Sequence, residues 1–168
     1  VLLHALDPES LSDPADQLRM LVALDKVECL TQAVRIRTLM ALGDDGPSWT
    51  GLDEQDLRHE IAIARRTSEY NAGQALELAR SITRDHPDFL TALADGRVSW
   101  GHLAVLVDRT RYVTDPAAIA AISSRALTRA LTRTPGQFAS EVEKLVARFD
   151  PDAAERHRRA KKKERRVW

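Results

Sequence analysis

Proline follows a capping residue at three places in the C-terminal half of the chain, and this pairing restricts the fold strongly. The pairs are Asp115-Pro116, Thr134-Pro135 and Asp150-Pro151. An Asp or Thr side chain accepts the free backbone N–H groups of a first helical turn, and proline suits the first helical position because it has no N–H to satisfy. Each pair therefore predicts the start of a helix.

The composition favours the same fold class. Hydrophobic residues make up 43% of the 168-residue chain, Ala and Leu dominate them, and few are aromatic. Ala and Leu lose little conformational freedom in a helix, whereas Val and Ile form no alternating runs that would indicate strands. We predict an all-α chain of about eight helices joined by short loops. The expected ranges are 14–43, 54–67, 69–85, 88–96, 100–113, 117–133, 136–149 and 152–168.

The first predicted helix is longer than average, and its apolar residues recur at intervals of three to four. That spacing predicts one apolar face. The helix is then either the spine on which the others pack or the seam of a homodimer, and we favour the spine because the heptad pattern drifts. The residues of this predicted face are Leu18, Leu21, Val22, Leu24, Val27, Leu30, Val34, Ile36, Leu39 and Met40.

Cys29, the only cysteine, lies within that apolar face. It cannot form an internal disulfide, so a reducing compartment is expected, and a buried structural thiol fits better than a nucleophile. No run of about eighteen apolar residues exists, which argues against a membrane span. We therefore expect a cytoplasmic chain that does not contact a membrane.

Charge is divided unevenly along the chain. The 25 basic and 25 acidic residues balance, yet residues 156–168 contain eight cations and one carboxylate, a net +7, which leaves −7 on residues 1–155. This asymmetry predicts contact with nucleic acid or another acidic partner, and a solvated linker helix fits the charge equally well. We divide the chain into a helical domain (1–150) and a basic arm or linker (151–168). The arm's cations are Arg156, Arg158, Arg159, Lys161, Lys162, Lys163, Arg165 and Arg166.

Residues 58–77 resemble a helix-turn-helix DNA reader. Ile61 and Ala62 would pack the first helix, and Ser68 would cap the second, which turns Ala72 and Ala75 inward. The motif is degenerate because Arg66 stands where such turns usually have glycine, so an ordinary helical hairpin with a polar surface is the alternative. Asn and Gln can pair with adenine edges, and arginines can hold phosphates. The predicted DNA contacts here are Arg65, Arg66, Ser68, Tyr70, Asn71 and Gln74, with Arg80 as a further phosphate contact.

Two segments carry a family resemblance. TALADGRVSWGHLAVLVD (91–108) and DPDAAERHRRAKKKERRVW (150–168) resemble the helical domain of unknown function 222, the N-terminal part of the 13E12 repeat family of actinobacterial proteins. The long first helix and the segment IARRTSEYNAGQALELAR also fit, so that the resemblance covers roughly residues 15–168.

The resemblance implies an HNH endonuclease domain C-terminal to this helical region, and a further domain is accordingly expected after residue 168. The five histidines of this chain lack metal-ligand spacing and have no cysteine pair beside them. We therefore assign no catalytic residue, metal ligand or cofactor here, since a divalent metal would belong to the nuclease domain. The expected partner is double-stranded DNA, and the alternative is a non-catalytic module that dimerises or docks on its own C-terminal domain.

Overall fold

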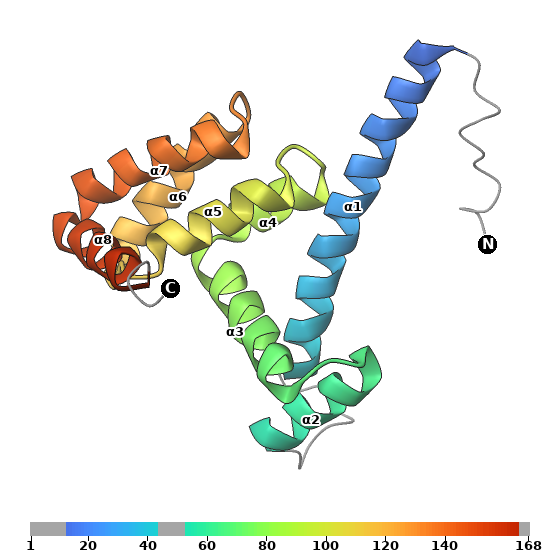
Figure 1. Cartoon of the computed structure of the whole chain (residues 1–168), viewed down its shortest axis with the longest axis horizontal. Coiled ribbons are helices and arrows are strands. Elements are labelled where there is room, and N and C mark those ends of the chain that lie inside the picture. Colours follow the sequence, from blue (N-terminus) through green and yellow to red (C-terminus); the bar gives the residue numbers. More distant parts are fainter. Residues whose placement is uncertain (1–12, 44–52, 165–168) are drawn as a thin grey trace.

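The computed structural model describes residues 13–43 and 53–164, and within these ranges it contains eight helices and no strand (Figure 1). The predicted all-α fold with a long N-terminal helix is confirmed. The helices are α1 (Pro14–Gly43), α2 (Glu54–Arg65), α3 (Glu69–Asp85), α4 (Pro87–Ala94), α5 (Trp100–Thr110), α6 (Pro116–Ala130), α7 (Pro135–Phe149) and α8 (Pro151–Glu164).

Capping side chains begin these helices where the sequence predicts. Asp53 Oδ1 accepts hydrogen bonds from the backbone N–H groups of Gln55 and Asp56, at 2.8 and 2.9 Å. Thr134 and Gln137 form a reciprocal capping box at the start of α7. Because such bonds satisfy groups that have no partner inside the helix, they fix each boundary locally.

The helices form two packed groups that share one core. Helix α1 packs on α4 and α3 and, at its C-terminal end, on α2, while α7 packs on α5, α6 and α8. Phe89 of α4 and Phe138 of α7, both fully buried, join the groups with their ring centroids 6.0 Å apart. Figure 1 shows the N-terminal half of α1 extending beyond the other helices.

The prediction that the apolar residues of α1 form one core-facing stripe is wrong. Only Cys29, Ala33, Ile36 and Leu39 are buried on this helix. The large apolar residues that remain exposed are Leu18, Leu21, Val22, Leu24, Val27, Leu30 and Val34. Some of these apolar residues are only two positions apart, as Val22 and Leu24 or Val34 and Ile36 are, which turns them about 200° from one another on an α-helix. They therefore fall on more than one face, and the other described helices cover only one of those faces.

Cys29 is buried, as predicted for a structural thiol. Burial raises the pKa of this thiol above its ordinary value, which disfavours the reactive thiolate. None of the described helices is long and apolar enough to cross a membrane.

Candidate nucleic-acid interface

The turn between α2 and α3 gives Arg66 a backbone conformation that suits glycine. Arg66 has φ 51° and ψ 49°, and its N–H donates to the carbonyl of Ile63 at 3.1 Å. The N–H of Thr67 donates to the carbonyl of Ala62 at 2.9 Å, and Ser68 then caps α3 by accepting from Asn71 N–H at 3.1 Å. The position where helix-turn-helix motifs usually have glycine is therefore left-handed in this chain as well.

Replacing Arg66 with glycine should stabilise the chain. A non-glycine residue in the left-handed region costs about 1 kcal/mol, which glycine avoids. Urea unfolding of Arg66→Gly is therefore expected to give a free energy of unfolding about 1 kcal/mol higher than wild type. Arg65→Gly is the matched control: Arg65 is the last residue of α2, and glycine there should destabilise by up to about 1 kcal/mol. Equal effects of the two substitutions would contradict this account.

The inward and outward residues of the α2–α3 pair lie as the sequence predicts. Ile61, Ala62 and Ala72 are buried, Ala75 is half-buried against the core, and Tyr70 is 74% exposed. Six DNA contacts are predicted at the turn between α2 and α3, which we call the corner, and all six residues are exposed. They are Arg65, Arg66, Ser68, Tyr70, Asn71 and Gln74. The fold thus gathers them on an accessible surface at the turn.

Carboxylates outnumber the arginines in the same helix pair. Residues 53–85 contain seven acidic and five basic residues. Arg80 donates to Glu54 at 3.0 Å and to Glu77 at 2.7 Å, and its hydrogen bond, followed by that of Arg58, lowers the pKa of Glu54. Arg80 is therefore occupied by carboxylates, and the net negative charge opposes a phosphate backbone.

One face of helix α8 packs against α5 and α7. Ala153, Ala154 and His157 are buried. The Nε2 atom of His157 lies 3.3 Å from Asp108 Oδ2, and its ring meets the Tyr112 ring edge-on with centroids 5.9 Å apart. Arg156 Nη2 donates to the Tyr112 carbonyl at 3.0 Å. These contacts fix the first two turns of α8 on the end of α5.

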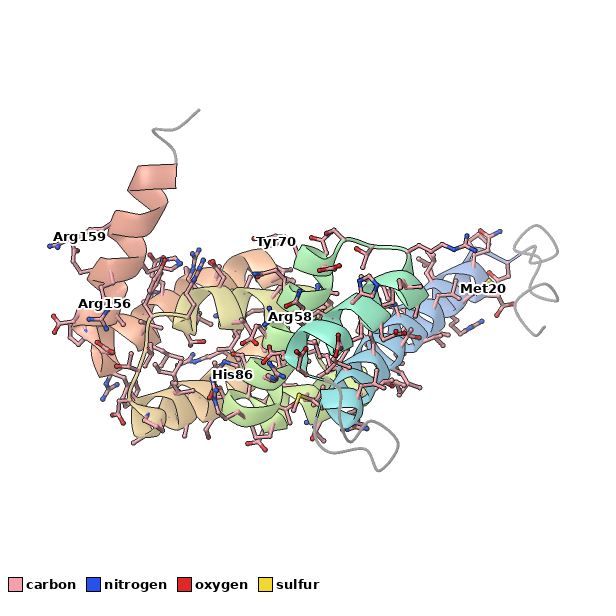
Figure 2. The ribbon with its side chains drawn as sticks, turned by 90° about the horizontal axis from the view of Figure 1, so that it is seen from below. Met20, Arg58, Tyr70, His86, Arg156 and Arg159 are labelled. Atoms are coloured by element: carbon pink, nitrogen blue, oxygen red, sulfur yellow. The ribbon has the colours of Figure 1, made fainter. Side chains whose placement is uncertain are left out.

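Beyond His157, α8 continues away from the other helices (Figure 2). The side chain of Arg159 is 79% exposed and pairs with Glu155 at 2.9 Å, and Arg156 is also exposed. Arg158 and Lys161, Lys162 and Lys163 belong to the same helix, and the structure describes their backbone. Arg165 and Arg166 lie outside the described residues.

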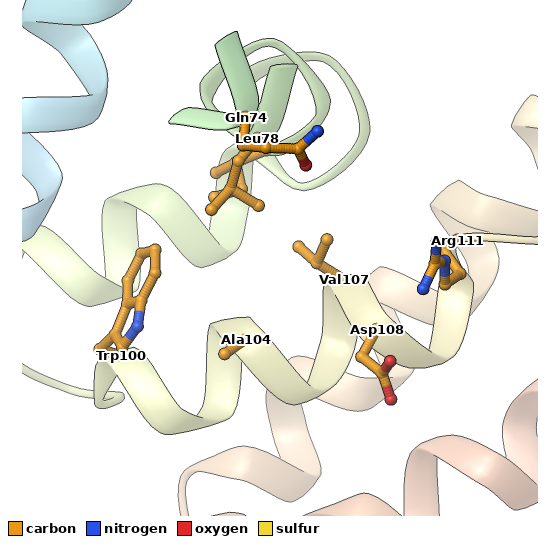
Figure 3. Close-up of a pocket in the computed structure, with 8 residues that line it drawn as sticks. Gln74, Leu78, Trp100, Ala104, Val107, Asp108 and Arg111 are labelled. Carbon is orange, nitrogen blue, oxygen red and sulfur yellow. The ribbon is translucent and has the colours of Figure 1, made fainter. Parts of the chain in front are cut away.

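A pocket of about 330 Å³ lies between α3 and α5, and Figure 3 shows the residues that line it. Gln74 and Leu78 of α3 face Trp100, Val107 and Arg111, which come from α5 and the turn after it. The Arg111 guanidinium lies 5.1 Å from the centroid of the Tyr112 ring.

Arg111 is a candidate contact that the sequence did not reveal. It lines the same pocket as Gln74, and the carbonyl of its neighbour Tyr112 holds Arg156. An exposed cation therefore lies between the predicted corner and the arm. No local pattern marks Arg111, because its nearness to Gln74 depends on how α3 and α5 pack.

Residue types that could carry metal chemistry are dispersed. In residues 13–43 and 53–164 no group of three or more His, Cys, Asp or Glu side chains is close enough to hold a metal ion. His102 beside the Ser99 cap has a structural environment: its Nε2 lies 2.8 Å from the Arg133 carbonyl and its Nδ1 lies 2.9 Å from Ser99 Oγ. His102 is buried and the neighbouring Trp100 is half-buried.

Comparison with known proteins gives one match. A family model described as a domain of unknown function (DUF222) matches residues 18–168, which include both the α2–α3 corner and α8. No curated protein and no solved structure matches the chain.

Proposed function

The chain belongs to the DUF222 family, a domain of unknown function, and we propose that it is a non-catalytic module that holds double-stranded DNA for a nuclease domain of the same protein. In this proposal the basic end of α8 supplies most of the electrostatic attraction to the DNA phosphates. The observation that carries this proposal is the run of six cations from Arg156 to Lys163 on α8, a helix that leaves the packed body (Figure 2), with Arg165 and Arg166 following in the sequence.

Electrostatics favour the arm over the α2–α3 corner as the main contact. Residues 156–168 of the arm have a net charge of +7, whereas residues 53–85 have a net charge of −2. Cations that meet a phosphate backbone release condensed counterions, and this release drives association without regard to base sequence. The arm therefore supplies affinity.

The corner is the second part of the proposed surface. Tyr70 and the projecting end of α8 lie toward the same side of the molecule in Figure 2. Asn71 and Gln74 offer amide groups that suit adenine edges, and Arg65, Arg66 and Arg111 offer exposed cations. A duplex drawn in by the arm would meet these polar side chains next, so the corner would position the DNA.

Duplex binding by matched variants tests this division of roles. In the arm variant, the seven cations from Arg158 to Arg166 become Gln, and Arg156 is kept because it holds the Tyr112 carbonyl. In the corner variant, Arg65 and Arg66 become Gln. Fluorescence anisotropy with a labelled duplex at low salt should show binding weakened at least ~100-fold by the arm variant and about tenfold or less by the corner variant.

Circular dichroism would establish that both variants retain the helical fold. Wild-type binding by the arm variant would remove α8 from the proposal. The opposite pattern, in which only the corner variant loses affinity, would move the main contact to the α2–α3 turn. A wild-type chain that binds no duplex even at low salt would overturn the function proposed.

A further inference from the structure

The exposed apolar residues of the molecule are concentrated on α1. Seven of the ten large hydrophobic residues exposed in the described ranges belong to this helix. Among them, Val27 is 52% and Val34 49% exposed. A helix that is apolar on opposite faces is typical of one covered on both sides, and within residues 13–43 and 53–164 of a single copy the other helices cover only one of the two faces.

The free face of α1 has the spacing of a coiled-coil seam. Its residues follow one another at intervals that alternate between four and three, an average of 3.5, and all but the half-buried Met20 are exposed. They are Met20, Leu24, Val27, Thr31, Val34 and Thr38. Val27 and Val34 precede the buried Cys29 and Ile36 by two residues, a rotation of about 200°, so the seam faces away from the core. Although the pattern drifts over the whole helix, this alternation of four and three within residues 20–38 is the spacing that one helix presents to another in a coiled coil.

We propose that α1 of one copy pairs along this seam with α1 of a second copy, in antiparallel orientation. A two-fold axis midway between Thr31 and Val34 sets Thr31 against Val34 of the second copy, and Val27 against Thr38. The same helix surface then serves both copies, as a two-fold symmetric interface requires. Leu30, which is 47% exposed, flanks the seam and adds apolar surface to it.

Charges beside the seam select the antiparallel orientation. Glu28 and Arg35 are exposed, lie seven residues apart and flank the same edge of the seam. In the antiparallel pair, Glu28 of each copy comes within about 3 Å, along the helix axis, of Arg35 of the other copy. This happens twice because of the symmetry. A parallel pair would instead set Glu28 against Ala23 and Arg35 against Leu30. Opposite charges at such flanking positions determine helix orientation.

The test is the molecular mass of the whole chain in solution without DNA. Sedimentation equilibrium from about 1 to 200 µM should show the 18.8 kDa chain approaching twice that mass. Val27→Glu with Val34→Glu places two carboxylates in the seam and should raise the dissociation constant at least ~100-fold. The matched control is Leu18→Glu with Val22→Glu, which alters two exposed residues of the same helix outside the seam and should leave the dimer intact.

A charge exchange tests the orientation. Glu28→Arg alone and Arg35→Glu alone should each weaken the dimer several-fold, and the two together should restore it. A monomer at the highest concentration would overturn the proposal, and so would a control pair that weakens the dimer as much as the seam pair does. A dimer that the exchange does not rescue would overturn the antiparallel arrangement. Because no DNA is present, these results are independent of the function proposed above.

Discussion

Raising the salt concentration from about 50 to 200 mM is expected to weaken duplex binding about a thousand-fold. The logarithm of affinity falls with the logarithm of salt by about 0.9 for each phosphate neutralised. If about six of the eight arm cations meet phosphates, the slope is near −5, and a fourfold change in salt gives this factor. A titration at four or five salt concentrations measures the slope directly.

The arm and corner variants show which cations produce the salt dependence of binding. The arm variant, which retains Arg156, should give a slope between about 0 and −2. Arg65→Gln with Arg66→Gln should reduce the steepness by at most about 2, because only two cations are removed. If wild type and the arm variant share one slope, the salt-sensitive contacts lie elsewhere on the molecule.

Acidification from pH 6.5 to 4 is expected to lower the free energy of unfolding by about 3 kcal/mol through His86 alone. His86 is buried, at 1% exposure, and burial lowers its pKa from 6.5 to about 4. The unfolded chain therefore binds a proton in this pH range that the folded chain does not. Stability from this group is complete above pH 6.5 and is lost as pH falls toward 4.

The partners of His86 suit the neutral ring. Thr110 Oγ1 lies 3.2 Å from Nε2 and donates its own proton to the Leu106 carbonyl, so it accepts from the ring. Ser123 Oγ lies 3.2 Å from Nδ1 and can donate to it. Protonation would turn Nδ1 into a second donor, so the Ser123 hydroxyl would have to rotate and accept instead.

Unfolding curves of wild type and His86→Gln between pH 4 and 7 measure this contribution. The difference in the free energy of unfolding between the two should shrink by about 3 kcal/mol as the pH falls. His59→Gln is the control with opposite sign: Glu69 accepts from His59 at 2.8 Å and raises its pKa, so that stability from His59 is present at low pH and lost as pH rises. A constant difference for His86→Gln would contradict the proposed cause.

Local chemistry explains which parts of the fold the sequence predicts. Asp53, Ser68 and Thr134 bond to backbone groups two or three residues away, so each helix start follows from neighbouring residues alone. The buried positions Ile61, Ala62 and Ala72 follow in the same way from the spacing within two helices. The conformation of Arg66 is also local, because a tight turn between two helices needs one left-handed residue.

Features that depend on distant segments are not predictable in this way. Apolar residues of α1 fit both a core-facing stripe and a 3.5-residue seam, and only the positions of α3 and α4 decide which is covered. Gln74 and Arg111 line one pocket because α3 and α5 pack together. The occupation of Arg80 by Glu54, 26 residues earlier, is likewise a tertiary contact. Periodicity and charge counts contain none of these relationships.

The continuity of α8 has a consequence for conformational entropy. The helix runs without interruption from Pro151 to Glu164, and Ala153 and His157 hold it on the body. A flexible segment would lose about 1–2 kcal/mol per backbone residue when a partner ordered it. A segment that is already helical has lost this freedom before any encounter. Residues 151–164 are thus presented along one direction, and the association with DNA proposed above would not carry the entropic cost of folding them.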